Sequence, residues 1–332
     1  MALIKVSGLS KRFNLEAGFF ARTGGPFGRY VQAVSDLDFY IDKNECYGLV
    51  GESGCGKTTT ARLLVRMYEP DEGEIVFRDS IDVRSLKKEN LKKYRENVKY
   101  IFQDPARSLN PRMTIYEILT SGRRWSSIKP NEKQNREDAA AILEETGLNA
   151  ADLPRRPSEF SGGQRQRISI ARALLMKPEL LICDEVVSAL DVSIQGQILN
   201  LLLDIRSRRD LSFLFIAHDL KVACYFCDRI GVMYRGELME EAPARTLREE
   251  GIHPYTELLF SSVSKSSAGT DRTGTDQTGR QVQETKKPAA VTSGAGCVFA
   301  GRCPYAEKCC FESKPPLAEL REGHRLRCFI KK

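Results

Sequence analysis

The sequence predicts an α/β fold with a mainly parallel sheet, and three observations support this prediction. Over residues 1–260, short β-branched runs alternate with amphipathic stretches, as in chains that cover a sheet with helices. The runs Leu180–Cys183 and Ser212–Ala217 are continuously apolar, which is typical of strands buried on both faces of a parallel sheet. Residues 110–175 carry little strand signal and include helical stretches such as Glu137–Thr146, so we expect a helical insertion there.

The first strands and the first helix are located from their local patterns. Four apolar residues fit early strands: Val6, Val34, Leu37 and Phe39. Cys46–Val50 indicates a strand that runs into a glycine-rich turn, and Thr58–Tyr68 carries a helical pattern. A strand, a glycine-rich turn and a helix in this order form a common context for phosphate binding.

Size and composition limit the remaining possibilities. The 332 residues leave room for one large domain and a small appendage, and 41% hydrophobic residues suffice for an ordinary core. The formal charge of +7 permits contact with anionic lipids or phosphates but does not indicate a nucleic-acid partner. No apolar run approaches the roughly 18 residues that span a bilayer, and residues 1–13 lack the apolar segment of a signal peptide. We therefore expect a cytoplasmic chain that reaches a membrane only through partners.

The composition changes toward the C-terminus. Residues 261–296 are dominated by Ser, Thr, Gly, Gln and Lys, so we expect a flexible linker there. Residues 297–332 follow as a small cysteine-rich extension, which holds five of the ten cysteines. In a reducing compartment, such a cluster indicates metal binding before it indicates disulfides.

A phosphate-binding loop of the P-loop NTPase type spans residues 51–58. Its sequence, GESGCGKT, matches G-x-x-x-x-G-K-[ST] and lies between the predicted strand and helix. Glycines let backbone N–H groups turn toward phosphate oxygens, and the helix N-terminus adds positive potential. We expect Lys57 to neutralise β/γ-phosphate charge of ATP and Thr58 to bind Mg²⁺. The residues expected to contact the nucleotide are Gly51, Glu52, Ser53, Gly54, Cys55, Gly56, Lys57, Thr58 and Thr59.

Two acidic residues follow the apolar run at 180–183. Ligands of α/β sheets bind at the carboxyl ends of the strands, which places Asp184 near the Mg²⁺ ion. Glu185, one residue further along, is placed to polarise water for attack on the γ-phosphate. These acids and the phosphate loop together predict an ATPase.

Residues Phe160–Gln164, FSGGQ, resemble the signature motif of ABC-type ATPases, usually written LSGGQ, with Phe160 in place of leucine. The motif is specific here because it lies between a phosphate loop and an acidic strand. The resemblance implies an ABC-type nucleotide-binding domain, in which the signature of one protomer faces the γ-phosphate held by the other. Two ATP molecules then lie in a head-to-tail dimer. The residues that take this role by resemblance are Ser161, Gly162, Gly163 and Gln164.

Further elements of this family appear in order along the chain. By resemblance, Gln103 reaches Mg²⁺ and the attacking water, and His218 contacts the γ-phosphate. Together with Glu185, these two side chains make up the expected catalytic set. Phe13 stands where the family places an aromatic residue that stacks on adenine, and a core aromatic is the alternative interpretation.

Three stretches resemble the ATPase subunits of oligopeptide and dipeptide ABC importers, a group that also includes nickel importers. They are SLNPRMT at 108–114, VSALDVSI at 187–194 and HPYTELL at 253–259. The resemblance implies an energy-coupling ATPase at the cytoplasmic face of the membrane. Its implied partners are two permease subunits, a sister ATPase or a second copy, and an extracytoplasmic solute-binding protein, with no nucleic acid. The insertion at 14–30 is similar to that of the second of the two paired ATPases.

The cysteine-rich tail resembles the C-terminal extension of these peptide-importer ATPases. Its spacing is C-x₅-C-x₆-C-x₁₇-C, formed by Cys297, Cys303, Cys310 and Cys328. Four thiolates can hold a [4Fe–4S] cluster or a zinc ion. The wide gaps and the resemblance favour iron–sulfur, while zinc and unmetallated or disulfide-bonded thiols stay open. Cys309 is a spare that could replace Cys310.

Other functions remain as alternatives. A nickel-chelate importer of the same group would share every motif. A soluble ABC ATPase that acts on nucleic acid or ribosomes often carries two cassettes or a long coiled-coil insertion, and this chain shows one cassette. The importer-like stretches disfavour an exporter ATPase, and the intact catalytic set argues against a metal-sensing binding module.

Overall fold

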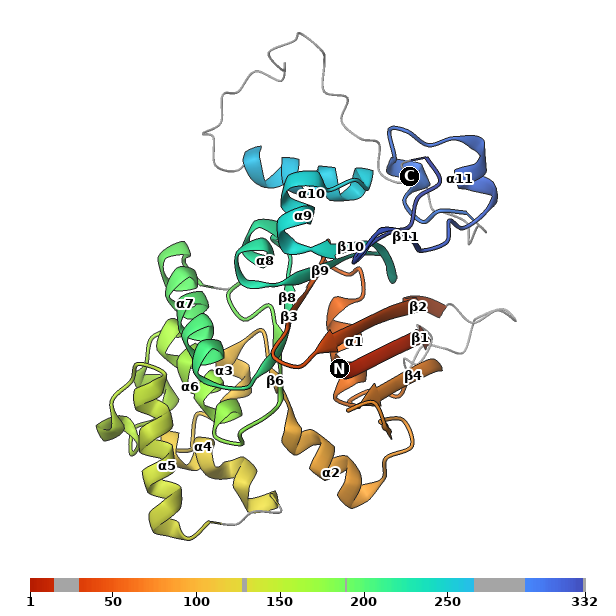
Figure 1. Ribbon diagram of the computed structural model, residues 1–332. Coiled ribbons are helices and arrows are strands. Elements are labelled where there is room, and N and C mark those ends of the chain that lie inside the picture. The colour runs from red at the N-terminus through yellow and green to blue at the C-terminus, as the bar shows by residue number, and fades with distance from the viewer. Residues whose placement is uncertain (15–29, 127–129, 189, 266–295, 331–332) are drawn as a thin grey trace, which may run out of the picture.

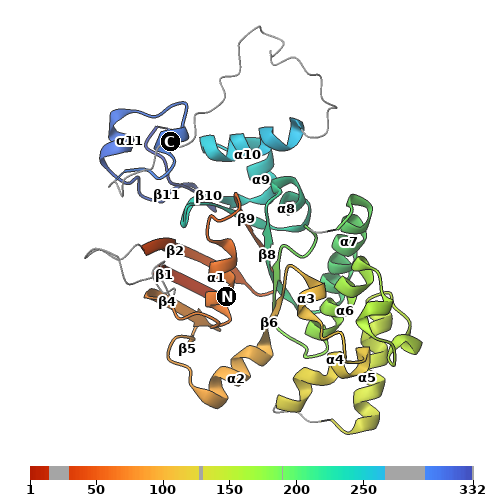
Figure 2. The same ribbon diagram turned by 180° about the vertical axis from the view of Figure 1, so that it is seen from behind.

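The structure is a computed structural model that describes residues 1–14, 30–126, 130–188, 190–265 and 296–330 (Figure 1). Residues 15–29 of the insertion expected at 14–30, and residues 266–295 of the linker expected at 261–296, lie outside the described residues. A large sheet runs through the middle of the molecule, with a helical region (α3–α7) on one side and a smaller sheet on the other, as Figure 2 shows from behind.

The large sheet has eight strands, in the order β11-β12-β10-β9-β3-β8-β7-β6. The five from β9 to β6 are parallel, which confirms the predicted α/β core, while β10, β12 and β11 add antiparallel pairs. The strands are β3 (Cys46–Val50), β6 (Val98–Ile101), β7 (Leu180–Asp184), β8 (Ser212–Ala217), β9 (Arg229–Tyr234), β10 (Glu237–Pro243), β11 (Ala318–Arg321) and β12 (His324–Leu326).

A separate antiparallel sheet holds the early strands, in the order β2-β1-β4-β5. They are β1 (Ala2–Asn14), β2 (Tyr30–Asp42), β4 (Glu72–Phe77) and β5 (Ile81–Asp82). The apolar residues of β1 and β2 pointed to strands but not to a second sheet, because alternation sets only which residues are buried and not which strands pair.

The helices are α1 (Lys57–Leu64), α2 (Lys88–Asn97), α3 (Pro105–Ser108), α4 (Ile115–Thr120), α5 (Glu132–Glu145), α6 (Gly162–Leu174), α7 (Val192–Arg208), α8 (Leu220–Phe226), α9 (Ala244–Glu250), α10 (Pro254–Lys265) and α11 (Lys308–Glu312). The described residues between Ile101 and Leu180 form helices and no strand. The helix predicted as far as Tyr68 ends at Leu64, because the chain turns at Arg66, whose φ is +55°.

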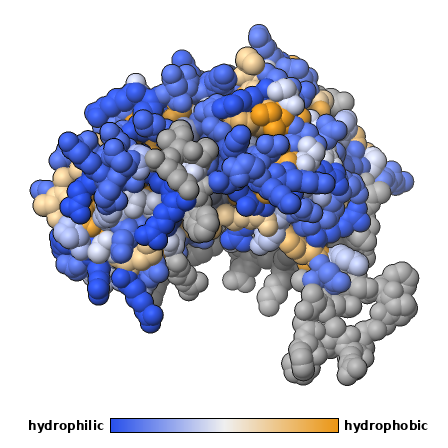
Figure 3. Space-filling model, turned by 90° about the horizontal axis from the view of Figure 1, so that it is seen from below, coloured by the Kyte–Doolittle hydropathy of each residue, from blue (hydrophilic) through white to orange (hydrophobic). Residues whose placement is uncertain are grey.

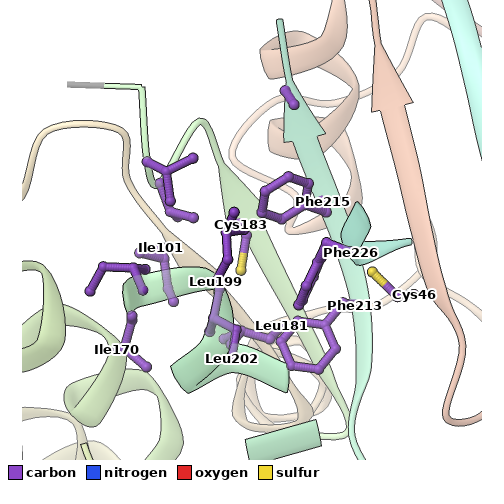
Figure 4. Close-up of a cluster of buried hydrophobic side chains, with 14 of the residues drawn as sticks. Cys46, Ile101, Ile170, Leu181, Cys183, Leu199, Leu202, Phe213, Phe215 and Phe226 are labelled. Atoms are coloured by element: carbon purple, nitrogen blue, oxygen red, sulfur yellow. The ribbon is translucent and has the colours of Figure 1, made fainter. Parts of the chain in front are cut away.

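The core lies on both faces of the large sheet. On the face shown in Figure 4, Phe213 and Phe215 of β8 pack against Phe226 of α8, with ring centroids 5.5 and 4.8 Å apart. Leu181 and Cys183 of β7 lie beside them and are also buried. None of the described helices combines the length and the apolar character needed to span a membrane. The surface seen from below is mainly hydrophilic, with hydrophobic residues in small groups (Figure 3).

The C-terminal extension is joined to the large sheet. β12 pairs with β10, and β11 pairs with β12. The carboxylate of Glu240 in β10 is fully buried and interacts with Nε2 of His324 in β12 at 2.8 Å. The same carboxylate accepts hydrogen bonds from the backbone N–H groups of Ile252 and His253, at 2.9 and 3.0 Å. The described part of the tail is therefore part of the folded body rather than a tethered appendage.

Candidate nucleotide site

Four predicted site segments meet at one edge of the large sheet. The strands β3, β8, β7 and β6 are neighbours and parallel. Three register pairs align their carboxyl ends: Val50 with Ala217, Asp184 with Ile216, and Ile101 with Cys183. The phosphate loop follows β3, His218 follows β8, Glu185 follows β7 and Gln103 follows β6. The carboxyl edge of a parallel sheet is where α/β proteins bind their ligands.

Two glycines shape the phosphate loop. A Cβ on Gly51 would lie 2.1 Å from a carbonyl oxygen of β9, and Gly56, with φ of +110°, would bring a Cβ to 2.2 Å from a carbonyl oxygen of β2. Gly56 is also the N-cap of α1. The buried ammonium of Lys57 donates to the carbonyl oxygens of Gly51 and Glu52, at 2.7 and 2.9 Å. This places a positive charge at the start of α1, as an anion site requires.

Asp184 is buried, and both of its carboxylate oxygens accept hydrogen bonds. Thr58 Oγ1 donates to Oδ1 at 3.0 Å, and the hydroxyl of Tyr100 in β6 donates to Oδ2. Burial, together with the negative Asp184, raises the pKa of Tyr100, so the phenol keeps its proton and remains a donor. The oxygen donors of Thr58 and Asp184 suit Mg²⁺, which prefers oxygen ligands.

Tyr100 is a site residue that the sequence analysis missed. It lies opposite Ile182 in the parallel pairing of β6 with β7, two residues from the end of the acidic strand. A polar aromatic residue in the strand that neighbours the acidic one would have been the available signal, but the strand order needed to use it was unknown.

Glu185 and Gln103 are brought together. Gln103 Nε2 donates to Glu185 Oε2 at 2.6 Å. The backbone of Glu185 is left-handed, with φ of +49°, and its N–H donates to the carbonyl oxygen of Ile216 at 3.1 Å. A non-glycine residue in this conformation is uncommon, and such strain gathers at functional sites.

His218 and Phe13, which were expected to contact the γ-phosphate and the adenine, lie just after β8 and near the end of β1. His218 is exposed directly after β8, and the next residue, Asp219, caps α8 by accepting the N–H of Lys221 at 2.7 Å. Phe13, near the end of β1, is half-buried and packs edge-on against Tyr68, with ring centroids 5.2 Å apart. The γ-phosphate contact and the adenine stacking remain predictions.

The signature begins helix α6. Ser161 is its N-cap: Ser161 Oγ accepts the N–H of Gln164 at 3.3 Å, and Gln164 Oε1 accepts the N–H of Ser161 at 2.9 Å. Both side chains are exposed. A Cβ on Gly163 would lie 2.7 Å from Cγ2 of Ile194 in α7, so only glycine fits this contact without a shift. The helices α1 and α6 lie apart in both ribbon views, so the signature does not adjoin the phosphate loop of its own chain (Figures 1 and 2).

Glu52 of the phosphate loop contacts two side chains from the C-terminal part of the chain. Arg302 donates to both carboxylate oxygens, at 2.8 and 2.9 Å. The hydroxyl of Tyr255 in α10 accepts the N–H of Glu52 at 2.8 Å. Glu52 is predictable as part of the loop, but no sequence pattern gives a role at this site to Arg302 or Tyr255, which are more than 200 residues away along the chain.

The four predicted cysteines of the extension gather around one small cavity. Cys297, Cys303, Cys310 and Cys328 line a space of about 20 Å³, together with apolar residues that include Phe299 and Ile330. Burial raises the pKa of Cys297, and the neighbouring Cys310, Cys328 and Cys303 raise it further. Within the described ranges, however, no three His, Cys, Asp or Glu side chains are arranged to hold a metal ion. Cys309 does not line the cavity, whereas Cys310 does.

Comparisons with known proteins agree with this geometry. The family model "ABC transporter" matches residues 34–188, and the model "Oligopeptide/dipeptide transporter, C-terminal region" matches residues 239–310. The chain is 40% identical to the oligopeptide transport ATP-binding protein AppF of Bacillus subtilis over 329 residues, 99% of this chain and 97% of that protein. It is 41% identical to a putative peptide import ATP-binding protein of Brucella ovis, over 98% of this chain and 97% of the relative.

Solved structures show the same fold. A dimeric ATP-binding cassette, MJ0796, bound to ADP and Pi, aligns with a TM-score of 0.63 and 25% identity over 73% of this chain and 99% of that one. The protein cbiO1 of Clostridium perfringens, part of the ABC transporter complex cbiONQ, aligns with a TM-score of 0.64 and 24% identity over 75% of this chain and 92% of that one. The chain therefore belongs to the ABC transporter family, as an ATP-binding subunit of the oligopeptide/dipeptide group whose ATP hydrolysis is coupled to transport.

Proposed function

We propose that this subunit hydrolyses ATP at composite sites and that hydrolysis drives the import of di- and oligopeptides. Each site combines the phosphate loop of one ATP-binding subunit with the signature of a second. The proposal rests on one observation: Lys57, Asp184 and the Gln103–Glu185 pair converge at one sheet edge, while the exposed signature begins a helix elsewhere in the chain.

Each residue has a role that its position supports. Phosphoryl transfer to water depends mainly on positioning and on stabilising negative charge. Lys57 and the loop N–H groups carry the positive potential, and Thr58 and Asp184 offer the oxygen ligands for Mg²⁺. Glu185, oriented by Gln103, takes the proton of the attacking water. His218 of this chain, and the Ser161–Gln164 signature of the second subunit, complete the environment of the γ-phosphate.

The cargo and the partners follow from the relatives. Their names include oligopeptide transport and peptide import, which supports peptides as the cargo. We place the subunit at the cytoplasmic face of the membrane, on two permease subunits, beside a sister ATPase or a second copy. An extracytoplasmic solute-binding protein delivers the peptide. Uptake of nickel chelates by the same type of complex is the second candidate.

Uptake by cells whose only copy carries Glu185→Gln tests the proposal. Labelled di- and oligopeptides, and labelled nickel, are supplied in parallel, and Glu249→Gln on the surface of α9 serves as the matched control. We expect peptide uptake at background level while the variant still binds ATP and stays with the membrane. Selective loss of nickel uptake would show that nickel chelates, and not peptides, are the cargo. Unchanged uptake with the protein in the soluble fraction would reject the importer in favour of a soluble ABC ATPase.

We also propose that the four cavity cysteines hold a metal centre, with an iron–sulfur cluster favoured over zinc. The donor set fits either, because thiolates ligate both. Structural zinc sites usually use closer C-x₂₋₄-C pairs than this chain has. The wide sequence spacing supports a larger centre. Such a centre would cross-link the stretches that carry the four cysteines.

Metal analysis of the full chain, purified without oxygen, tests this second proposal. Iron, sulfide and zinc are measured beside the visible absorption spectrum, for the wild type, Cys297→Ser and Cys309→Ser. We expect iron and sulfide in the wild type and in Cys309→Ser, and their loss in Cys297→Ser, because Cys309 does not line the cavity. Zinc in stoichiometric amount would show that the centre is a zinc site and not an iron–sulfur cluster. A chain with neither metal would contradict the proposal of a metal centre.

A further inference from the structure

We propose that Arg302 of the C-terminal extension is a positioning residue of the nucleotide site: it neutralises Glu52 in the phosphate loop and so strengthens ATP binding. The two side chains form a bidentate pair, with Arg302 nitrogens 2.8 and 2.9 Å from the two carboxylate oxygens of Glu52. Paired guanidinium and carboxylate groups of this geometry are among the stronger and more specific ion pairs. The inference rests on ATP binding at this loop.

The charge of Glu52 matters because of where its backbone lies. Its carbonyl oxygen accepts a hydrogen bond from Lys57 Nζ at 2.9 Å, so Glu52 touches the cation expected to hold the phosphates. A lone carboxylate at this position repels a polyphosphate and offsets part of the attraction of Lys57. Pairing with Arg302 cancels that charge without occupying Lys57.

Aromatic rings hold Arg302 in place. Its guanidinium lies 5.6 Å from the ring centroid of Tyr234 and 5.8 Å from that of Phe299, distances typical of cation–π contacts. Phe299 also packs against Tyr255, with ring centroids 5.4 Å apart, and the Tyr255 hydroxyl accepts the N–H of Glu52. The extension therefore reaches Glu52 twice, directly through Arg302 and indirectly through the Phe299–Tyr255 contact. Both extension residues lie between Cys297 and Cys303, so the phosphate loop is braced by the stretch that forms part of the cysteine cavity.

Titration of the full-length chain with a fluorescent ATP analogue and Mg²⁺ measures the effect. We expect Arg302→Ala to weaken binding roughly five- to thirty-fold at 50 mM salt, which corresponds to about 1 to 2 kcal/mol. The loss should shrink at 300 mM salt, because a contribution from a partly exposed charge is screened. Arg302→Lys, which keeps the charge but not the fork, should lose less. Arg321→Ala is the matched control, since Arg321 lies in the same extension but pairs with Glu250 of α9.

A double-mutant cycle separates charge neutralisation from loosening of the extension. We expect Glu52→Gln to restore much of the affinity that Arg302→Ala loses, because the double variant has neither charge of the pair. An unchanged affinity of Arg302→Ala would overturn the inference, and so would a double variant that binds as weakly as Arg302→Ala alone, which would indicate a structural role. If the wild type itself bound no nucleotide, the proposed function would fail instead.

Discussion

The buried carboxylate of Glu240 gives the sharpest test of how the extension is held. Glu240 accepts hydrogen bonds from two backbone N–H groups and interacts with Nε2 of His324, all at 2.8 to 3.0 Å, and it has no exposed surface. Glu240→Ala leaves these partners buried without an acceptor. Hydrogen bonds to a charged group contribute about 1.5–3 kcal/mol each, but they are not additive. Because several of these bonds are lost together, we expect a destabilisation of about 3–5 kcal/mol.

Hydrogen exchange measures this loss where it is expected. Backbone amides of β12 should exchange roughly 10²- to 10⁴-fold faster in Glu240→Ala, since about 1.4 kcal/mol of opening free energy corresponds to a factor of ten. Amides of β7 and β8 should change far less, because they lie on the other side of β3 and β9. Glu249→Ala, at an exposed position on α9, is the control and should leave β12 unchanged. Equal exchange of β12 in Glu240→Ala and the wild type would refute the view that this carboxylate anchors the extension.

Three further predictions concern the signature, the core and the pH dependence. Gly163→Ala should lower ATPase activity in a steady-state assay by pushing α6 away from α7. Adding Ile194→Ala should restore part of the activity, because it removes the clashing Cγ2 atom. Failure of this rescue would argue against the steric explanation. Phe226→Ala should destabilise the fold by about 3–5 kcal/mol in urea titrations, because its ring is buried between two phenylalanines. Burial raises the pKa of Glu240, but the hydrogen bonds to its carboxylate outweigh burial, and the net pKa is lowered. The stabilisation by Glu240 is therefore present above the unfolded pKa of about 4.3 and is lost as pH falls through the folded pKa. Hydrogen exchange of β12 with the same pH dependence in Glu240→Gln as in the wild type would contradict this.

The nucleotide site was the most predictable part of the molecule because local patterns define it. A strand, a glycine-rich turn and a helix are contiguous in sequence, so the position of Lys57 at the start of α1 follows from the motif. The meeting of Gln103 with Glu185 was expected from the family resemblance, which gave both side chains a role at the γ-phosphate.

Contacts that depend on strand order or on distant packing were not predictable. Tyr100 reaches Asp184 only because β6 is the neighbour of β7, and hydrophobic patterning carries no information about neighbours. The antiparallel sheet of β1, β2, β4 and β5 was missed for the same reason. Arg302 has no local signal at all, since an arginine in a polar tail normally indicates a solvated surface position.

The extension illustrates why a change in composition is a poor guide to where a cooperative unit ends. A boundary near residue 260 passes between β10 and β12, two strands that hydrogen-bond to each other. The matched "Oligopeptide/dipeptide transporter, C-terminal region" instead begins at residue 239, inside β10, so it includes Glu240 and the stretch from Cys297 to Cys310. That region ends at residue 310, before β12, so it too leaves out the strand that pairs with β10 and helps to bury the Glu240 carboxylate. Two contacts, from Glu240 to His324 across a separation of 84 residues and from Glu52 to Arg302 across 250, bind the tail to the sheet and to the phosphate loop. The extension should therefore influence nucleotide affinity even though it contributes no predicted catalytic group.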